Sequence, residues 1–136
     1  MDLIVTTPKP EAANSAREAA NVIRDGGGTY FRFLGQRLPS NFRSGVSRLY
    51  YVQDGFIRGF AVISSIDNAQ YLCMTTNRQW PQGYYAVMDA RTWTWIKPIP
   101  MKGFQAWRYF TPPNDRFARI PVEIVGNWLD PMPKVL

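Results

Sequence analysis

The segment Arg43–Ile66, RSGVSRLYYVQDGFIRGFAVISSI, decides the fold. Its two halves, Arg48–Val52 and Phe56–Ile66, are rich in aromatic and β-branched residues, which favour strands. Gln53, Asp54 and Gly55 lie between them, and Asp-Gly suits a tight turn because glycine tolerates positive φ and aspartate can hydrogen-bond its own backbone. The segment therefore predicts a β-hairpin with a long second strand.

The second strand of this hairpin is apolar on both faces, so we expect it to be buried on both sides. Simple alternation gives one face Phe56, Arg58, Phe60 and Val62 and the other face Ile57, Gly59, Ala61 and Ile63. Gly59 is expected to let another backbone approach closely or to mark a bulge that bends the strand. A long, bent central strand is typical of a small closed or half-closed barrel.

The composition fits one basic, aromatic-rich domain. The chain has 136 residues, 15% of them aromatic, and a net charge of +6. Four of its sixteen cationic residues are lysines and the rest are arginines, which can bind phosphate and base edges with two hydrogen bonds and stack on rings. A basic balance indicates a polyanionic partner, and a solvated basic surface is the alternative.

Several kinds of site are excluded by residue type. The chain has one cysteine, Cys73, and no histidine. This excludes an internal disulfide, a Cys/His zinc site and a Ser-His or Cys-His nucleophile pair, and we expect no metal and no cofactor. No stretch approaches the roughly 20 apolar residues of a membrane helix, and the start lacks a signal-peptide pattern. We expect a reducing, cytoplasmic location and no membrane partner, and the oligomeric state stays open.

The first third of the chain predicts a strand and a helix. Asp2–Thr6 is a short apolar run, and Glu11–Arg24 is alanine-rich with apolar residues at helical spacing. The glycines Gly26–Gly28 then end the helix. A phosphate loop is rejected here because the Walker pattern places its glycines before a helix and adds Lys-Ser/Thr.

Thr29–Leu34 is the next predicted strand, with Tyr30, Arg32 and Leu34 on one face. Burying an unpaired arginine is costly, so we expect Arg32 either to reach solvent at the strand end or to line a pocket. The polar connection Gly35–Gly45 follows. From Gly27 to Phe60 the chain has five arginines and one acid, a net charge of +4.

Further strands are expected downstream. Tyr71–Thr75 predicts a short strand with Cys73 in the core. Tyr84–Met88 and Arg91–Ile96 predict a second hairpin across Asp89-Ala90. Trp93 and Trp95 share a face of its second strand, where they serve either as core or as a stacking platform.

The segment Lys97–Pro113 combines aromatic and cationic residues. Pro98 and Pro100 forbid an interior strand or helix, so an irregular loop is predicted. Its rings and cations are Phe104, Trp107, Tyr109 and Phe110 with Lys97, Lys102 and Arg108 between them. This mixture is typical of a surface that stacks bases and neutralises phosphates, and a loop that plugs one barrel end is the alternative.

The last residues complete one domain over residues 1–136. Phe117–Val125 has strand character, with Pro121 indicating an edge strand, and residues 126–136 form a C-terminal tail in which Trp128 docks on the body. The predicted fold class is α+β: a small mixed β pseudo-barrel with one N-terminal helix and short additional helical turns.

The chain resembles the PUA-like superfamily, and within it the ASCH and EVE branches. The residues that carry the resemblance are Ile23–Gly28 at a helix end, Thr29–Arg32 as a strand ending in arginine, Phe42–Gly45 with Tyr50–Tyr51 as the entry to the next strand, and Gly55 with Gly59–Val62. The resemblance covers roughly residues 1–110. It implies a small barrel with a cleft for RNA or a modified base.

The resemblance also implies where an active site or a base cage would lie. Some ASCH members are hydrolases with a lysine and a threonine in a Gly-x-Lys-Thr-like stretch. The matching stretch here, Gly27–Arg32, has no lysine, although Thr29 or Arg32 is expected at the comparable place. EVE members hold a modified base in an aromatic cage, for which Tyr30, Trp80, Trp93 and Trp107 are the candidates.

Three functional hypotheses follow. The favoured one is a nucleic-acid-binding module that recognises RNA or a modified base in a basic aromatic cleft. Its expected contacts are Arg32, Arg58, Trp80, Lys97, Lys102, Trp107 and Arg108, with Tyr30 and Trp93 as base-stacking candidates. The second is a nucleoside or RNA hydrolase, whose general base would come from Asp54, Asp89, Asp115, Glu123, Lys97 or Lys102. The third is a protein-interaction domain, which predicts that Trp80 and Trp107 are buried or face a flat apolar patch.

Overall fold

The structure is a computed structural model that describes residues 1–7, 24, 28–70, 72–73, 78–79, 81–110, 122–130 and 133. The predicted helix lies outside the described residues except for Arg24, as do Trp80, Asp115 and Pro121. The strands are β1 (Asp2–Thr6), β2 (Thr29–Gly35), β3 (Arg48–Gln53), β4 (Phe56–Ala69), β5 (Leu72–Cys73), β6 (Arg78–Gln79), β7 (Gly83–Asp89), β8 (Thr94–Pro100), β9 (Trp107–Phe110) and β10 (Ile124–Asn127), and the 3₁₀ helix η2 is Ala90–Thr92.

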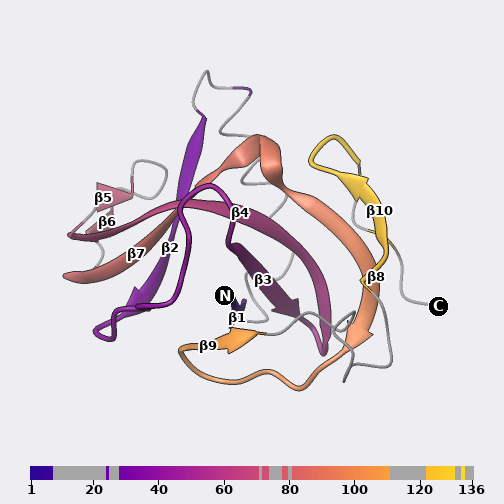
Figure 1. Cartoon of the computed structure of the whole chain (residues 1–136), viewed down its shortest axis with the longest axis horizontal. Helices are drawn as coiled ribbons and strands as arrows, with labels where there is room; N and C mark the ends of the chain where they lie inside the picture. Colours follow the sequence, from indigo (N-terminus) through magenta and orange to yellow (C-terminus); the bar gives the residue numbers. More distant parts are fainter. Residues whose placement is uncertain are drawn as a thin grey trace.

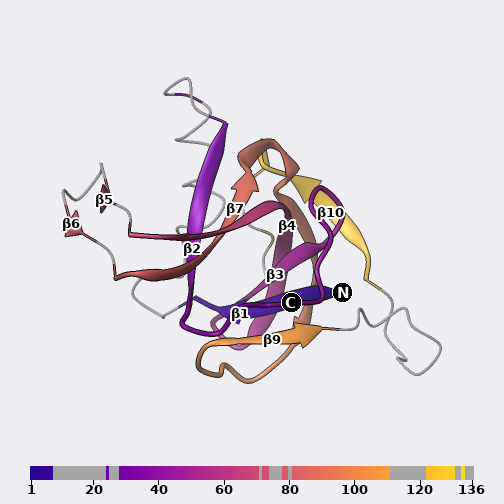
Figure 2. The ribbon, with the colours of Figure 1, turned by 60° about the vertical axis from the view of Figure 1, so that its left-hand side comes forward.

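The described residues form a mixed eight-stranded sheet around β4. Its main order is β10-β8-β4-β3-β1-β9, and β7 joins β2 to β4 (Figure 1). β1 and β3 are parallel, and the other pairs are antiparallel. The sheet curls so that the lower end of β2 approaches β1 and β9 (Figures 1 and 2). β5 and β6 pair with each other in a small separate sheet.

The hairpin predicted from Arg48–Val52 and Phe56–Ile66 is confirmed as β3 and β4, and β4 continues to Ala69. Its turn residues Asp54 and Gly55 both have positive φ, 51° and 83°, as the Asp-Gly pattern predicts for a two-residue turn. The first half of β4 pairs with β3 and β8, and the second half pairs with β7. One strand therefore belongs to two parts of the curled sheet.

Gly59 both marks a bulge and allows a close backbone approach, so the two expectations for it are confirmed. The register with β3 shifts between Tyr51, which faces Gly59, and Val52, which faces Ile57, so Arg58 is an extra residue. A Cβ atom on Gly59 would lie 2.4 Å from the carbonyl oxygen of Thr94 on β8. Only glycine lets β8 pack this closely.

The bulge makes the predicted face assignment of β4 wrong at one position. Simple alternation separates Ile57 from Phe60, but both side chains lie in the same core cluster. The extra residue Arg58 inverts the alternation on its N-terminal side. Ala61 and Ile63 lie in the other cluster, as predicted.

The two faces of the sheet carry two apolar clusters, so β4 is buried on both sides as predicted. The first core cluster lies on the inner side of the curl and comprises Leu3, Val5, Tyr30, Leu34, Leu49, Tyr51, Ala61, Ile63, Ala86, Met88, Ala90, Trp93, Trp95 and Trp107. The second core cluster comprises Ile4, Tyr50, Val52, Ile57, Phe60 and Ile96, with Ile99, Met101, Phe104, Phe110 and Val122 packed against it.

The predicted second hairpin is wrong, because β7 and β8 do not pair with each other. β7 pairs with β2 and β4, and β8 pairs with β4 and β10. Between them η2 turns the chain: the Asp89 carboxylate accepts from the Arg91 backbone N–H, and the Thr92 hydroxyl donates to the Asp89 carbonyl. The Thr92 hydroxyl also accepts from the backbone N–H of Val62, which fixes the turn to β4.

The predicted irregular loop is also wrong in part, because β8 runs through Pro98 and Pro100 and residues 107–110 form β9. β8 pairs with β4 at Ile99 and Pro100, whereas its register with β10 covers only Thr94, Trp95 and Ile96. Among the described residues, the prolines therefore lie where β8 has one strand neighbour, and there a missing N–H is tolerated.

The predicted strand Phe117–Val125 is wrong in its bounds where the structure describes it, because β10 begins at Ile124 and extends to Asn127, into the predicted tail. β10 lies at the edge of the sheet, and Trp128 packs against the first core cluster. Of Tyr71–Thr75, residues 72–73 form β5, and the expectation of a buried Cys73 lies outside the described side chains. No helix in the described part of the chain is long and apolar enough to cross a membrane.

We expect Gly59→Ala to destabilise the protein by about 1–3 kcal/mol, because the new methyl group would overlap the Thr94 carbonyl and the Trp93 ring. Urea unfolding followed by tryptophan fluorescence measures this change. Gly28→Ala is the matched control, since its Cβ would meet only an Arg91 side-chain atom at 3.7 Å. Equal unfolding midpoints for the two variants would contradict the close-packing argument.

Candidate nucleic-acid interface

Arg32 lies where the curled sheet is open between β2 and the pair β1–β9. We call this opening the seam and define it by Arg32, Arg37, Thr6 and Trp107. Arg32 is half-buried, and its Nη2 donates to the carbonyl oxygen of Thr6 at 2.8 Å. Its Nε is buried and has no hydrogen-bond acceptor among the described residues. The guanidinium thus links β2 to β1, and its Nε–H donor has no acceptor among the described residues.

Arg37 and Trp107 hold the seam through reciprocal contacts. The Arg37 guanidinium carbon lies 3.8 Å from the centre of the Trp107 ring, and Nη2 donates to the Trp107 carbonyl at 2.8 Å. The indole Nε1 of Trp107 donates back to the Arg37 carbonyl at 3.1 Å. This contact combines a cation–π interaction with two hydrogen bonds, and it ties the chain after β2 to β9.

Tyr109 fastens the same connection two residues along β9. Its phenol oxygen accepts from the backbone N–H groups of Ser40 at 3.0 Å and Asn41 at 3.2 Å, and it lies 3.4 Å from the Ser40 hydroxyl. These contacts, the Ser40 hydroxyl first, hold the pKa of Tyr109 below its ordinary value, and the positive charge of Arg37 acts in the same direction.

Arg108 points away from the seam, over the second core cluster. Its guanidinium carbon lies 4.2 Å from the centre of the Phe104 ring. The backbone N–H of Phe104 donates to the Thr6 hydroxyl at 3.1 Å, and a Cβ on Gly103 would lie 3.1 Å from the Thr6 methyl group. Thr6 is therefore the common neighbour of Arg32 on β2 and of the loop that carries Lys102 and Phe104.

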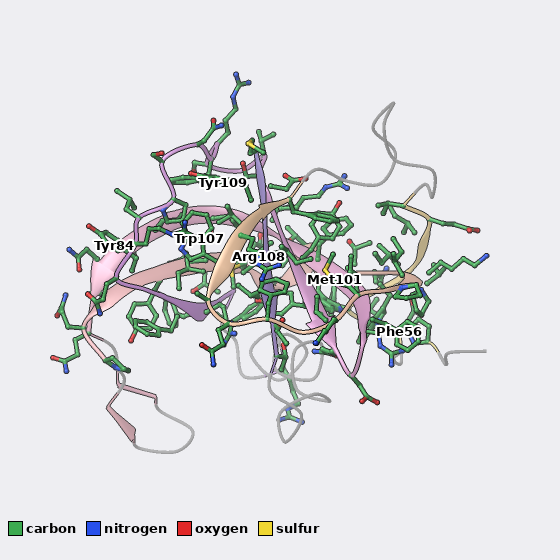
Figure 3. All side chains as sticks on the ribbon, turned by 90° about the horizontal axis from the view of Figure 1, so that it is seen from below. Phe56, Tyr84, Met101, Trp107, Arg108 and Tyr109 are labelled. Carbon is green, nitrogen blue, oxygen red and sulfur yellow. The ribbon has the colours of Figure 1, made fainter. Side chains whose placement is uncertain are left out.

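Figure 3 views the molecule from below and shows Trp107, Arg108 and Tyr109 together over β9, with Met101 and Phe56 to one side. Lys102 and Arg108 are exposed, and so is Arg37, which contacts Trp107, the residue before Arg108. Within the described part of the chain, none of these three cations forms an ion pair with a carboxylate. This end of the sheet thus presents positive charge beside aromatic rings.

The structure places Arg58 elsewhere. It is the extra residue of the β4 bulge and is 7% exposed, with Nε donating to the Gln53 carbonyl at 3.3 Å and Nη1 to the Pro133 carbonyl at 3.5 Å. Burial lowers its pKa, and the nearby Asp54 carboxylate opposes this effect. The contacts of Arg58 are those of a structural residue.

Tyr30, Trp93 and Lys97 also lie apart from Lys102 and Arg108, whereas Trp107 precedes Arg108 on β9 but is buried. Tyr30 and Trp93 lie in the first core cluster, and Trp93 is 0% exposed and packs against Trp95 with ring centres 5.1 Å apart. Trp107 is 2% exposed, so no face of its ring is open to a base. The Lys97 side chain is exposed on β8, and the backbone N–H of Lys97 donates to the Glu123 carbonyl.

The acidic residues proposed for a hydrolase are distributed over separate elements. Asp54 lies in the β3–β4 turn, Asp89 caps η2, and Glu123 precedes β10. Within the described residues no three Cys, His, Asp or Glu side chains are grouped as they would be around a metal ion.

Four residues of this interface had no role in the sequence-based site: Thr6, Arg37, Phe104 and Tyr109. Phe104 and Tyr109 were visible as rings between cations, and Arg37 as part of the basic connection. The sequence does not show which residues contact one another in space. Thr6 contacts Phe104, and Arg37 contacts Trp107, but the members of each pair are far apart in sequence.

We expect Tyr109 to ionise at a lower pH than the buried Tyr50, whose pKa is raised chiefly by burial. Below the ordinary tyrosine pKa of 10.0, folding therefore favours phenolate at Tyr109. The lowered pKa of Tyr109 therefore stabilises the folded state. This stabilisation is fully present above pH 10.0 and is lost as the pH falls through the pKa that Tyr109 has in the folded protein. An absorbance titration at about 295 nm, with circular dichroism as a check on folding, should lose an early ionisation in Tyr109→Phe and a late one in Tyr50→Phe. Loss of a late step in Tyr109→Phe would contradict this assignment.

No protein-family model matches the chain, and no curated protein matches it. Among solved structures, the chain is similar to the crystal structure of a mutant ZmASCH protein from Zymomonas mobilis. The two share 14% sequence identity with a TM-score of 0.47, over 81% of this chain and 88% of that one.

Proposed function

We propose that this protein is a nucleic-acid-binding module that holds RNA, or a nucleic acid with a modified base, on the surface formed by β9 and the loop before it. The observation that carries the proposal is the group of exposed cations Arg37, Lys102 and Arg108, which have no carboxylate partner among the described residues. Polyanion binding relieves the mutual repulsion of such charges and releases counterions from the nucleic acid.

The local charge supports this choice of partner. The described carboxylate on β1 is that of Asp2, four residues before Thr6 and so about 13 Å away along an extended strand. That carboxylate accepts from the backbone N–H of Arg48. Asp2 therefore leaves the charge of Arg32, which donates to the Thr6 carbonyl, uncompensated.

A protein-interaction role is a second candidate, and two observations favour it. Trp107 is buried, as that hypothesis predicts. Exposed apolar side chains also gather at the edge strand β10 and the turn after it: Ile124 is 61% exposed, Val125 47% and Leu129 70%. These residues lie away from β9 in the strand order, so the two candidates concern different surfaces.

We expect Lys102→Ala and Arg108→Ala each to weaken binding of a labelled single-stranded RNA, because each variant removes one charge that would neutralise a phosphate. The slope of the logarithm of the binding constant against the logarithm of the salt concentration should become shallower by about 0.7 for each phosphate that is no longer neutralised. Fluorescence anisotropy over a salt series measures both quantities. Arg91→Ala is the matched control: it removes the same charge from η2, which lies at the opposite end of the molecule from β9 (Figure 1).

Two outcomes would contradict the proposal. The first is an absence of RNA and DNA binding at low salt, which would leave the protein-interaction role as the candidate. The second is an equal loss of affinity in Arg91→Ala, which would indicate general attraction to a basic protein and no defined surface.

A further inference from the structure

Four arginines lie over aromatic rings in the described structure, and they differ in what else holds them. Arg37 lies over Trp107, Arg48 over Phe60, Arg58 over Phe56 and Arg108 over Phe104. The first three donate hydrogen bonds to protein acceptors: the Trp107 carbonyl, the Tyr50 hydroxyl and the Gln53 carbonyl, respectively. Each of these three guanidinium groups is therefore held by a protein acceptor as well as by a ring.

Arg108 is different because, among the described residues, its guanidinium contacts only the Phe104 ring. The residue is exposed, and within the described part of the chain its side chain makes no hydrogen bond or ion pair. A guanidinium that lies on a ring turns one flat face to the ring and its other face outward. All five of its N–H donors also remain available.

The ring beneath Arg108 is held in place. Phe104 is half-buried and packs against the second core cluster, and its backbone N–H is bonded to the Thr6 hydroxyl. Gly103 lies against Thr6 as well. Phe104 therefore orients the guanidinium before any ligand arrives, and this lowers the entropy cost of binding.

We infer that a single unpaired base stacks on Arg108. One face of the guanidinium lies on the Phe104 ring, and the base would lie on the opposite face; we call this guanidinium the stacking plate. This inference rests on the proposed function and adds the kind of nucleic acid bound. Bases stack on arginine guanidinium planes as they do on aromatic rings, and only unpaired bases expose a free face. The ligand class is thus single-stranded or looped nucleic acid, with Lys102 placed to contact a phosphate.

The stacking plate also explains how an aromatic surface can bind a base while its rings are covered. Trp107 and Phe104 both carry an arginine on one face, so direct stacking of a base on these rings would first require the arginine to leave. At Arg108 the base adds to the existing pair and displaces nothing.

The test compares Arg108→Lys with the natural chain on two oligonucleotides of equal length, one with normal bases and one abasic. Lysine keeps the charge but has no flat face, so we expect the variant to bind the base-containing strand roughly 5- to 150-fold more weakly, the range of one base stack. The abasic strand should bind equally to both proteins, and the salt slopes should be unchanged. Phe104→Leu should show the same pattern in a weaker form.

The outcomes separate this inference from the proposed function. If the base-containing strand binds both proteins equally, the stacking plate is refuted and the charged surface stands. If Arg108→Lys weakens both strands alike, Arg108 is a phosphate contact or a structural residue, which circular dichroism of the variant distinguishes, and the stacking plate is again refuted. If the natural chain binds neither strand, the stacking plate and the proposed function fail together.

Discussion

The absence of a side chain at Gly59 is the constraint on which the rest of this fold depends. β4 must pair with β3 on one side, with β8 on the other and then, past Ile63, with β7. A strand can serve three neighbours only if it bends, and the Arg58 bulge supplies that bend. Because the Thr94 carbonyl lies where a Cβ would stand, β8 follows the bend closely and the first core cluster closes around Trp93.

The curled sheet does not close by strand pairing between β2 and the pair β1–β9, and arginine side chains cross the seam. Arg32 donates to a β1 carbonyl, and Arg37 donates to a β9 carbonyl while stacking on Trp107. These bonds satisfy backbone acceptors as a neighbouring strand would. They also concentrate positive charge at one end of the sheet. Part of the basic character of this protein is thus structural, and part of it faces solvent at Lys102 and Arg108.

The sequence predicted local elements well and long-range neighbours poorly. β1, β2 and the β3–β4 hairpin follow from residue type, alternation and the Asp-Gly turn, each of which acts over a few residues. The second hairpin failed because pairing partners are chosen by the whole sheet: β7 and β8 each pair with a different half of β4. The same limit applies to the predicted site residues, since Arg58 and Arg108 look alike in sequence and both lie over a ring, and only the bulge in β4 shows that Arg58 is buried whereas Arg108 is exposed.

The position of β1 between β3 and β9 has a consequence for how the chain is made. β1 pairs with β3 on one side and with β9 on the other, so one of its partners is synthesised much later than β1 itself. At about 5–20 residues per second, the 57 residues from the end of β3 at Gln53 to the end of β9 at Phe110 take roughly 3 to 11 s to synthesise. During this interval one edge of β1 is without its partner. An unpaired strand edge can pair with another chain, so this interval exposes the nascent protein to aggregation.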